Sequence, residues 1–140
     1  MKKEIVEVVA AVVFDRGKLL CSQRPEGKAH AGKWEFPGGK LEKGETAAQA
    51  LVRELREELN YQVNPLDEMY RLAVYPTPER ELVLHFVRAY PESGSFPVSC
   101  ENQQFCWVTP TELDQVDFLS TDQEFVDFLK MAYGVKRMKV

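Results

Sequence analysis

The chain has 140 residues, of which 44% are hydrophobic and 29% charged, a balance typical of one soluble globular domain covering residues 1–140. Its formal net charge of −4 argues against long nucleic acid as a partner, because a phosphate backbone is bound through a basic surface. The three cysteines are an odd number without close Cys-x-x-Cys spacing. They therefore favour reduced thiols in a cytoplasmic protein over a disulfide framework or a zinc site.

The N-terminal segment predicts a β-hairpin. Residues 5–14 are rich in valine and are expected to form a buried strand, followed by a turn at Asp15-Arg16-Gly17 and a second strand over residues 18–24. A signal peptide is not expected, because Glu4 and Glu7 interrupt the apolar run and no clear cleavage site follows. The run is also shorter than the ~20 residues that a membrane-spanning helix needs.

The middle of the chain predicts a loop, a sharp turn and one well-capped helix. Residues 25–33 are polar and predict a loop, and the turn at residues 36–39 cannot be part of a regular helix. A helix is predicted from Thr46 to Leu59, with Thr46 as N-cap and Gln49 completing a capping box. Asn60 follows, and asparagine often takes the left-handed conformation past a helix end.

The second half of the chain predicts more strands and a final helix. Residues 69–75 and 81–90 are expected to form strands joined by a turn with two prolines, and residues 104–108 a short strand. Residues 111–113 predict one helical turn, and residues 121–132 an amphipathic helix. Mixed strands and helices with hairpins predict an α/β (α+β) fold, in which a mixed β-sheet is covered by helices.

Three acidic residues on the predicted helix stand out. Glu54, Glu57 and Glu58 have i, i+3 and i+4 spacing, so they project from one side of the helix. Like charges at this spacing cost ~0.2–0.5 kcal/mol per pair, and two of the acids lie in the last turn, where the helix dipole favours cations. A solvated acidic face would explain the composition. A metal site would also explain the placement, because converging carboxylates suit Mg²⁺ or Mn²⁺.

Gly38 and Gly39 lie a short loop ahead of this helix. Glycine lets the backbone approach a ligand closely, and an exposed carbonyl at this turn could bind a metal. A Gly-Gly turn alone is more often structural than functional, so its meaning depends on the helix that follows it.

Together these residues form the pattern Gly39-x5-Glu45-x7-Arg53-Glu54-Leu55-Arg56-Glu57-Glu58-Leu59-Asn60-Tyr61. The pattern resembles the Nudix box, G-x5-E-x7-R-E-U-x-E-E-x-G-U, where U is a bulky apolar residue. The one departure is Asn60 in place of the final glycine, and asparagine tolerates the left-handed conformation. Residues 34–40, the leading hairpin and the late Glu101-x-Gln103 resemble the MutT subfamily. The resemblance implies the Nudix fold, a mixed β-sheet sandwiched between helices.

The resemblance also implies roles for individual residues. It implies that Mg²⁺, or Mn²⁺, is held by the carboxylates of Glu54, Glu57, Glu58 and Glu101 and by the carbonyl of Gly38. Arg53 is expected to pair with Glu45 and to orient the catalytic helix and loop. Glu54, Glu57 or Glu101 could serve as the general base, and the sequence does not choose among them.

Similarity to MutT implies hydrolysis of a nucleoside triphosphate to the monophosphate and pyrophosphate. The implied substrate-binding residues are Arg24, Glu35, Phe36, Lys40, Arg80 and Asp122. MutT-like proteins act on 8-oxo-dGTP, and this nucleotide is the expected substrate. Asp122 departs from the asparagine of bacterial MutT, and the related CTP pyrophosphohydrolases carry aspartate there, so CTP or a modified dCTP is an alternative.

Three other readings stay open at this point. The chain could hydrolyse ADP-ribose or a dinucleoside polyphosphate, as other Nudix enzymes do, although its short length and residues 34–40 favour a nucleoside triphosphate. It could be a Nudix domain that binds nucleotide without catalysis, although such domains usually lose acids of the box. It could also be an ordinary structural domain, which would leave the acidic cluster unexplained. A monomer and a homodimer are both compatible with the sequence, and no membrane association is expected.

Overall fold

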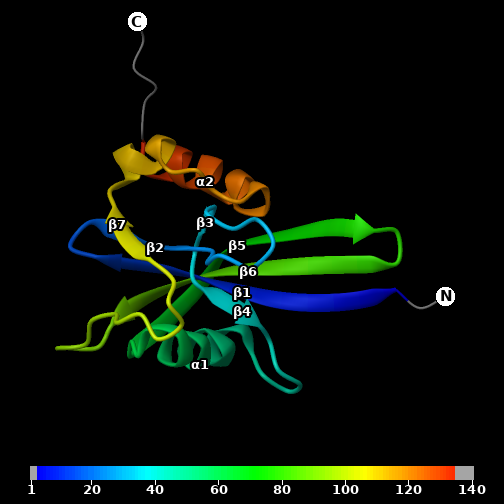
Figure 1. The fold of residues 1–140 in the computed structure, drawn as a ribbon, viewed down its shortest axis with the longest axis horizontal. Helices are drawn as coiled ribbons and strands as arrows, with labels where there is room; N and C mark the ends of the chain where they lie inside the picture. Colours follow the sequence, from blue (N-terminus) through cyan, green and yellow to red (C-terminus); the bar gives the residue numbers. More distant parts are fainter. Residues whose placement is uncertain (1–2, 135–140) are drawn as a thin grey trace, which may run out of the picture.

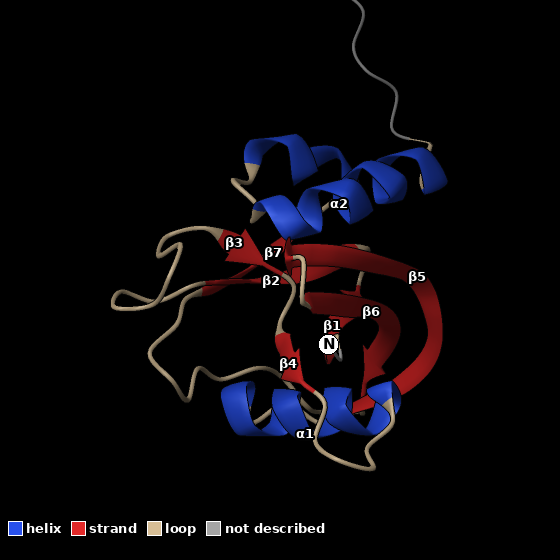
Figure 2. Cartoon of the chain, turned by 90° about the vertical axis from the view of Figure 1, so that its right-hand side faces the viewer, coloured by secondary structure: helices blue, strands red, loops and turns tan. Residues whose placement is uncertain are grey.

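The computed structural model describes residues 3–134 of the chain. A mixed β-sheet lies between helix α1 (Ala47–Leu59) on one face and helix α2 (Ser120–Ala132) on the other (Figure 2). The short 3₁₀ helix η1 (Pro110–Gln115) lies on the same side as α2. This confirms the predicted fold class. Residues 1–2 and 135–140 of the predicted domain lie outside the described residues.

The sheet has seven strands, in the order β3-β2-β1-β6-β5, with β4 paired to β1 and β7 paired to β2 (Figure 1). The strands are β1 (Glu4–Asp15), β2 (Lys18–Gln23), β3 (Trp34–Glu35), β4 (Gly38–Lys40), β5 (Val63–Thr77), β6 (Arg80–Pro91) and β7 (Phe105–Val108). Strands β1 and β6 run parallel at the centre, in register from Glu4↔Arg80 to Val13↔Ala89. The predicted hairpin is present, since β1 and β2 pair antiparallel through Phe14↔Leu19.

The middle of strand β1, residues 9–13, is buried on both faces, as its run of valines and alanines predicts. The predicted buried strand is wrong for its first residues, since Ile5 is 60% exposed. Because side chains alternate along a strand, Ala10 and Val12 belong to the core beneath α2. Val9, Ala11 and Val13 point the other way and pack in the core beneath α1. The strand therefore links the two cores and fixes the two helices on opposite sides of one rigid sheet.

Helix α1 has the caps that the sequence predicts. The hydroxyl of Thr46 accepts a hydrogen bond from the backbone N–H of Gln49, and the Gln49 side chain accepts one from the Thr46 backbone. Asn60 ends the helix in the left-handed conformation, with φ 46° and ψ 40°. Leu51, Leu55 and Leu59 are fully buried against the sheet. The acidic residues between them are therefore held at the border of the sheet.

The structure contains one strand that is longer than predicted and two short strands that the sequence did not predict. Strand β5 begins at Val63 instead of residue 69, although Pro65 and Asp67 disfavour a strand by local preference. It is an edge strand with irregular register, so proline and charged residues are tolerated there. Strands β3 and β4 are two and three residues long, and they exist only because β2 and β1 pair with them.

Strand β1 changes its partner along one edge. It pairs with β4 through residues 8–10 and with β2 through residues 14–15, so the sheet divides between β4 and β2. Residues of β1, β2 and β4 therefore surround a cavity at this point of the sheet. Within residues 3–134, none of the helices has the length and apolar character needed to span a bilayer.

Candidate active site

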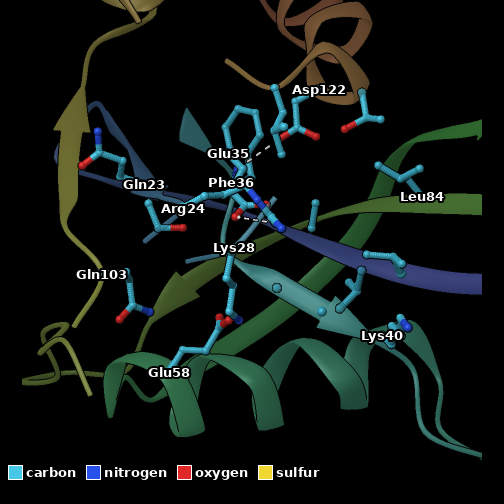
Figure 3. A pocket seen from close by; sticks show the side chains of 18 of the residues that line it. Gln23, Arg24, Lys28, Glu35, Phe36, Lys40, Glu58, Leu84, Gln103 and Asp122 are labelled. Carbon is cyan, nitrogen blue, oxygen red and sulfur yellow. Dashed lines mark hydrogen bonds and ion pairs between the residues drawn. The ribbon is translucent and has the colours of Figure 1, made fainter. Parts of the chain in front are cut away.

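A pocket of about 550 Å³ opens at the point where the sheet divides. Strands β1 and β4, the end of β2, the loop after β2 and the first turn of α2 all contribute to its wall. Figure 3 shows Glu58 of α1 at one end of the pocket and Asp122 of α2 at the other, with Arg24 and Lys28 between them. The pocket is therefore elongated, with an acidic group from a different helix at each end.

Gly39 lies directly against the carboxylate of Glu54. A Cβ atom on residue 39 would be 2.6 Å from Cδ and Oε1 of Glu54, which is far inside van der Waals contact. A Cβ atom on Gly38 would be 1.9 Å from the carbonyl oxygen of Val9. Position 38 therefore requires glycine, because its neighbour is backbone, whereas a side chain at position 39 would displace the Glu54 carboxylate. The turn and the helix, which are adjacent in the motif, are also in contact in space.

Arg53 ties helix α1 to the loop before it. Its Nε and Nη2 donate to Glu45 at 2.7 and 2.9 Å, which confirms the predicted pairing. Its Nη1 donates to Glu54 at 2.9 Å and to Glu57 at 3.3 Å, and Nη2 also donates to the carbonyl oxygen of Lys40 at 3.1 Å. The hydrogen bond from Arg53 lowers the pKa of Glu45 to about 2. Glu45 is therefore a permanent anion at neutral pH.

Glu58 lies in an environment that disfavours its charge. Burial, and then the negative charges of Glu54 and Glu101, raise the pKa of Glu58 to about 8. Burial also raises the pKa of Glu54, although the hydrogen bond from Arg53 opposes this. Glu101 comes from the loop before β7 and lines the pocket together with Glu58. Three predicted metal ligands thus interact electrostatically, and a cation beside them would relieve the repulsion.

The predicted ligands do not converge on one point as the side chains stand. In residues 3–134, no group of three or more His, Cys, Asp or Glu side chains is placed to hold a metal ion. Arg53 engages Glu54 and Glu57, and the Glu57 side chain is 55% exposed. The donor set nevertheless fits a hard cation, because half-buried carboxylates border a backbone turn that requires glycine at position 38.

At the other end of the pocket, Asp122 is buried, with 4% of its surface exposed. Its Oδ2 accepts a hydrogen bond of 3.2 Å from the backbone N–H of Phe36. Burial raises the pKa of Asp122 to about 7. A carboxyl group with such a pKa exists in both protonation states near neutral pH, so it can accept a hydrogen bond in one state and donate one in the other.

The predicted substrate-binding residues Arg24, Glu35 and Lys40 all line the pocket (Figure 3). The Arg24 guanidinium lies 3.5 Å from both carboxylate oxygens of Glu35, and its Nε donates to the carbonyl oxygen of Ala29 at 2.7 Å. Burial raises the pKa of Glu35, while Arg24 lowers it. Arg24 and Glu35 form a partly buried ion pair beside Asp122, so this part of the wall offers both donors and acceptors.

Two other predicted substrate-binding residues, Phe36 and Arg80, differ in how they lie relative to the pocket. Phe36 borders the pocket, but the residue is only 3% exposed, and its ring packs at centroid distances of 5.4 Å against Phe118 and Phe125. Arg80 lies at the start of β6, where its Nε is 3.3 Å from Glu4. It is not among the residues that line the pocket. The structure therefore gives Phe36 a core position and does not bring Arg80 to the site.

The sequence analysis did not predict several polar residues of the pocket wall, among them Lys28 and Gln103. Lys28 belongs to the loop after β2 and points towards Glu58 in Figure 3. Burial raises the pKa of both Glu58 and Glu35, and the charge of Lys28 partly offsets this rise. No sequence pattern indicates that a lysine in a polar loop will line a pocket. Gln103 was noted only as part of the resemblance around Glu101, and its place in the wall follows from the folded loop.

The sequence matches the NUDIX domain family over residues 5–129. A CTP pyrophosphohydrolase of Escherichia coli is 37% identical over 85% of this chain and 87% of its own length. An 8-oxo-dGTP diphosphatase of Haemophilus influenzae is 35% identical over 84% of this chain and 86% of its own length. The solution structure of the E. coli ORF135 protein superposes with a TM-score of 0.76 at 33% identity, covering 99% of this chain and 96% of that one.

These similarities extend over the whole sheet and over both helices that flank the pocket, not over the motif alone. The glycine turn, the Arg53–Glu45 pair and the acids of α1 lie inside the matched region. The chain therefore belongs to the Nudix family and is a Nudix hydrolase, an enzyme that cleaves a diphosphate linkage.

Proposed function

We propose that this enzyme hydrolyses a nucleoside triphosphate to the nucleoside monophosphate and pyrophosphate, with Mg²⁺ or Mn²⁺ as cofactor and 8-oxo-dGTP as the preferred substrate. The observation that carries the proposal is the two-ended pocket. One end has carboxylates against a glycine turn, and the other has a buried carboxyl group with hydrogen-bonding capacity. A nucleotide needs both, because its phosphates are anionic and its base is recognised through hydrogen bonds.

The phosphate end fits a divalent cation. Nudix hydrolases as a family use divalent metals. In this chain Glu54, Glu58 and Glu101, together with the Gly38 carbonyl, would hold the ion, and Glu57 would join them on release from Arg53. A bound cation neutralises phosphate charge and lowers the pKa of a bound water.

The protein's own side chains position the site, accept the proton and contact the phosphates. Arg53 and Glu45 fix the helix against the turn at Gly39, so the carboxylates keep their positions when the substrate enters. The proton of the attacking water would pass to one carboxylate. Glu101, which lines the pocket, Glu54, which lies against the Gly39 turn, and Glu57 are the candidates. Lys28, which points towards Glu58 in Figure 3, and Lys40 both line the pocket, where their ammonium groups would contact phosphate oxygens.

The base end supports two substrates. An ionised Asp122 accepts hydrogen bonds from N1–H and the amino group of an oxidised guanine, and it can equally accept from the exocyclic amine of cytosine. The relatives reflect both choices, since one is named a CTP pyrophosphohydrolase and others 8-oxo-dGTP diphosphatases. CTP, or a modified dCTP, is therefore the second candidate.

The deciding experiment is a metal-dependent assay over 8-oxo-dGTP, dGTP, CTP, dCTP and 5-methyl-dCTP, with ADP-ribose as a negative control. The measured quantity is kcat/KM for each compound, because specificity is a ratio of these values. We expect pyrophosphate as the product, no turnover in EDTA, and the highest kcat/KM for 8-oxo-dGTP. Release of inorganic phosphate alone, or a preference for ADP-ribose, would contradict the proposal.

Asp122→Asn should change the base preference and also the pH dependence of stability. The pKa of Asp122 is raised from 3.8 to about 7 in the folded protein. Between these two values the folded state keeps a proton that the unfolded chain has released, so the wild type loses stability as pH rises through this window. Asparagine has no proton to lose. The variant's Tm relative to wild type should therefore increase from about pH 4 to about pH 7.

The same variant tests base recognition. We expect the ratio of kcat/KM for 8-oxo-dGTP to that for CTP to change, because asparagine donates as well as accepts. Thr121→Ser is the matched control, since Thr121 neighbours Asp122 in the pocket wall and serine keeps its hydroxyl. An unchanged ratio in Asp122→Asn would remove Asp122 from base recognition.

Lys28→Gln should raise KM with little change in kcat. Loss of a charged hydrogen bond to phosphate in both the ground and transition states weakens binding by about tenfold. Lys33→Gln is the matched control, because Lys33 lies in the same loop but pairs with Asp117 at 2.9 Å. Equal KM values for Lys28→Gln and wild type would show that this lysine does not contact the substrate.

A further inference from the structure

Two of the three cysteines lie side by side on neighbouring strands of the sheet. Cys21 on β2 and Cys106 on β7 are directly opposed in antiparallel register. Cys21 is fully buried and Cys106 partly buried, whereas Cys100 is exposed in a loop. Sequence spacing could not reveal this pair, because the two strands are brought together only by the fold.

The strand geometry brings the two thiols within reach of a disulfide. The backbone N–H of Gln23 donates to the carbonyl oxygen of Gln104 at 2.8 Å, so the alternation of an antiparallel ladder makes Cys21 and Cys106 a hydrogen-bonded pair. The Cα atoms of such a pair lie about 5.5 Å apart, inside the range for disulfides. Their Cβ atoms lie roughly 4.5–5.5 Å apart, against about 3.8 Å in a disulfide. Bond formation must therefore draw β2 and β7 together locally.

The two thiols differ in reactivity. The neighbouring Cys106 thiol, and then burial, raise the pKa of Cys21. The neighbouring Cys21 thiol lowers the pKa of Cys106, against the effect of its partial burial. Cys106 is thus both the more accessible sulfur and the better thiolate, which are the properties of a cysteine that reacts first with an oxidant.

We propose that the Cys21–Cys106 pair is a site of reversible oxidation by hydroperoxides, and that the disulfide weakens substrate binding in the neighbouring pocket. With hydrogen peroxide, the Cys106 thiolate attacks one peroxide oxygen, the O–O bond breaks, and Cys106 becomes a sulfenic acid. The other oxygen leaves as hydroxide, which takes up the proton that the Cys106 thiol had released and becomes water. The sulfur of Cys21 then attacks the sulfenic sulfur, forming the S–S bond. The Cys21 proton and the sulfenic hydroxyl leave as a second water. Each sulfur has given up one electron, and the peroxide is reduced to two waters.

The disulfide would affect the pocket because both strands continue into its wall. Arg24 lies three residues after Cys21, and Gln103 three residues before Cys106, and both line the pocket. Ser22, next to Cys21, also lines it. Drawing the strands together therefore shifts two neighbouring segments of the pocket wall relative to each other. Glu54 and the glycine turn lie on α1 and β4, away from the two strands. The effect should consequently appear in KM more than in kcat, and this half of the inference rests on the proposed function.

The test uses the full chain carrying Cys100→Ser, which removes the exposed thiol. The protein is treated with hydrogen peroxide and compared with the same protein kept in a phosphine reductant. We expect the intact mass to fall by two hydrogen atoms and a proteolytic digest to contain the Cys21 and Cys106 peptides joined. We also expect KM for the best nucleotide to rise severalfold and to recover in dithiothreitol. Adding Cys106→Ser should abolish both effects, and a second protein with Cys21→Ser checks the other partner.

The outcomes separate the two claims. Added oxygen mass on Cys106 without cross-linked peptides, or two thiols that still react with an alkylating agent after peroxide, would overturn the oxidation site. A disulfide that leaves KM unchanged would overturn the coupling to the pocket. The mass measurement needs no substrate, so it tests the site even if the enzyme proves inactive on every nucleoside triphosphate. That inactivity would count against the proposed function alone.

Discussion

Glu54→Gln should lower kcat by about 10²–10³-fold, the effect of removing one group that stabilises charge in a transition state. Glutamine keeps the shape of the side chain, so its contact with Gly39 and the hydrogen bond from Arg53 can both persist. Only the negative charge is lost, and a cation at the site would lose one ligand. The measurement is kcat under saturating substrate and Mg²⁺, with circular dichroism to verify the fold.

The matched control is Glu92→Gln, at an exposed position after β6, which should keep wild-type kcat. Glu57→Gln should also lower kcat steeply if Glu57 leaves Arg53 to join the metal site. A titration with Mg²⁺ adds a second readout, because a lost ligand raises the metal concentration that gives half-maximal activity. Wild-type kcat in both Glu54→Gln and Glu57→Gln would remove the α1 acids from the chemistry and favour a domain that only binds nucleotide.

Arg53→Lys should lower kcat by about 10- to 100-fold, the range seen when a residue that orients metal ligands is lost. The guanidinium makes simultaneous hydrogen bonds to Glu45, Glu54, Glu57 and the Lys40 carbonyl. A lysine keeps the charge but offers a single point of contact, so it cannot reproduce this geometry. The role is positioning, and the expected signature is a lower kcat together with a weaker response to Mg²⁺.

Arg56→Lys is the matched control, because Arg56 lies on the same helix, in its last turn, and is exposed. It should behave as wild type. The double variant Glu45→Gln with Arg53→Lys gives a further check. If the two residues act as one unit, the double variant should be little worse than Arg53→Lys alone. Fully additive losses would show that Glu45 acts independently of Arg53.

The sequence predicted the features that depend on neighbouring residues. The caps of α1 are short-range, because Thr46, Gln49 and Asn60 satisfy the helix ends themselves. The pairing of Arg53 with Glu45 spans eight residues, from just before the N-cap to about two turns into α1. These elements follow from local hydrogen bonding and helical spacing, so the structure confirms their geometry. Their roles in catalysis remain predictions.

Features that depend on distant strands could not be predicted in the same way. Strand β4 exists because β1 supplies its hydrogen bonds, and the Cys21–Cys106 pair depends on the register of β2 with β7. Arg80 was expected at the base pocket from resemblance, but in the structure it lies beside Glu4 at the start of the central ladder. Lys28 reaches the pocket only because the loop after β2 folds over it.

The parallel pairing of β1 with β6 has a consequence for how the molecule is made. The ten-residue ladder joins the first strand to one that appears only after most of the chain. Contacts so distant along the chain slow folding. During synthesis the valine-rich strand β1 lacks its parallel partner until β6 has left the ribosome. Unpaired apolar strands of this kind are prone to aggregate. Helix α1 can form earlier, but the hollow between β4 and β2 takes its shape only when the last long strand docks.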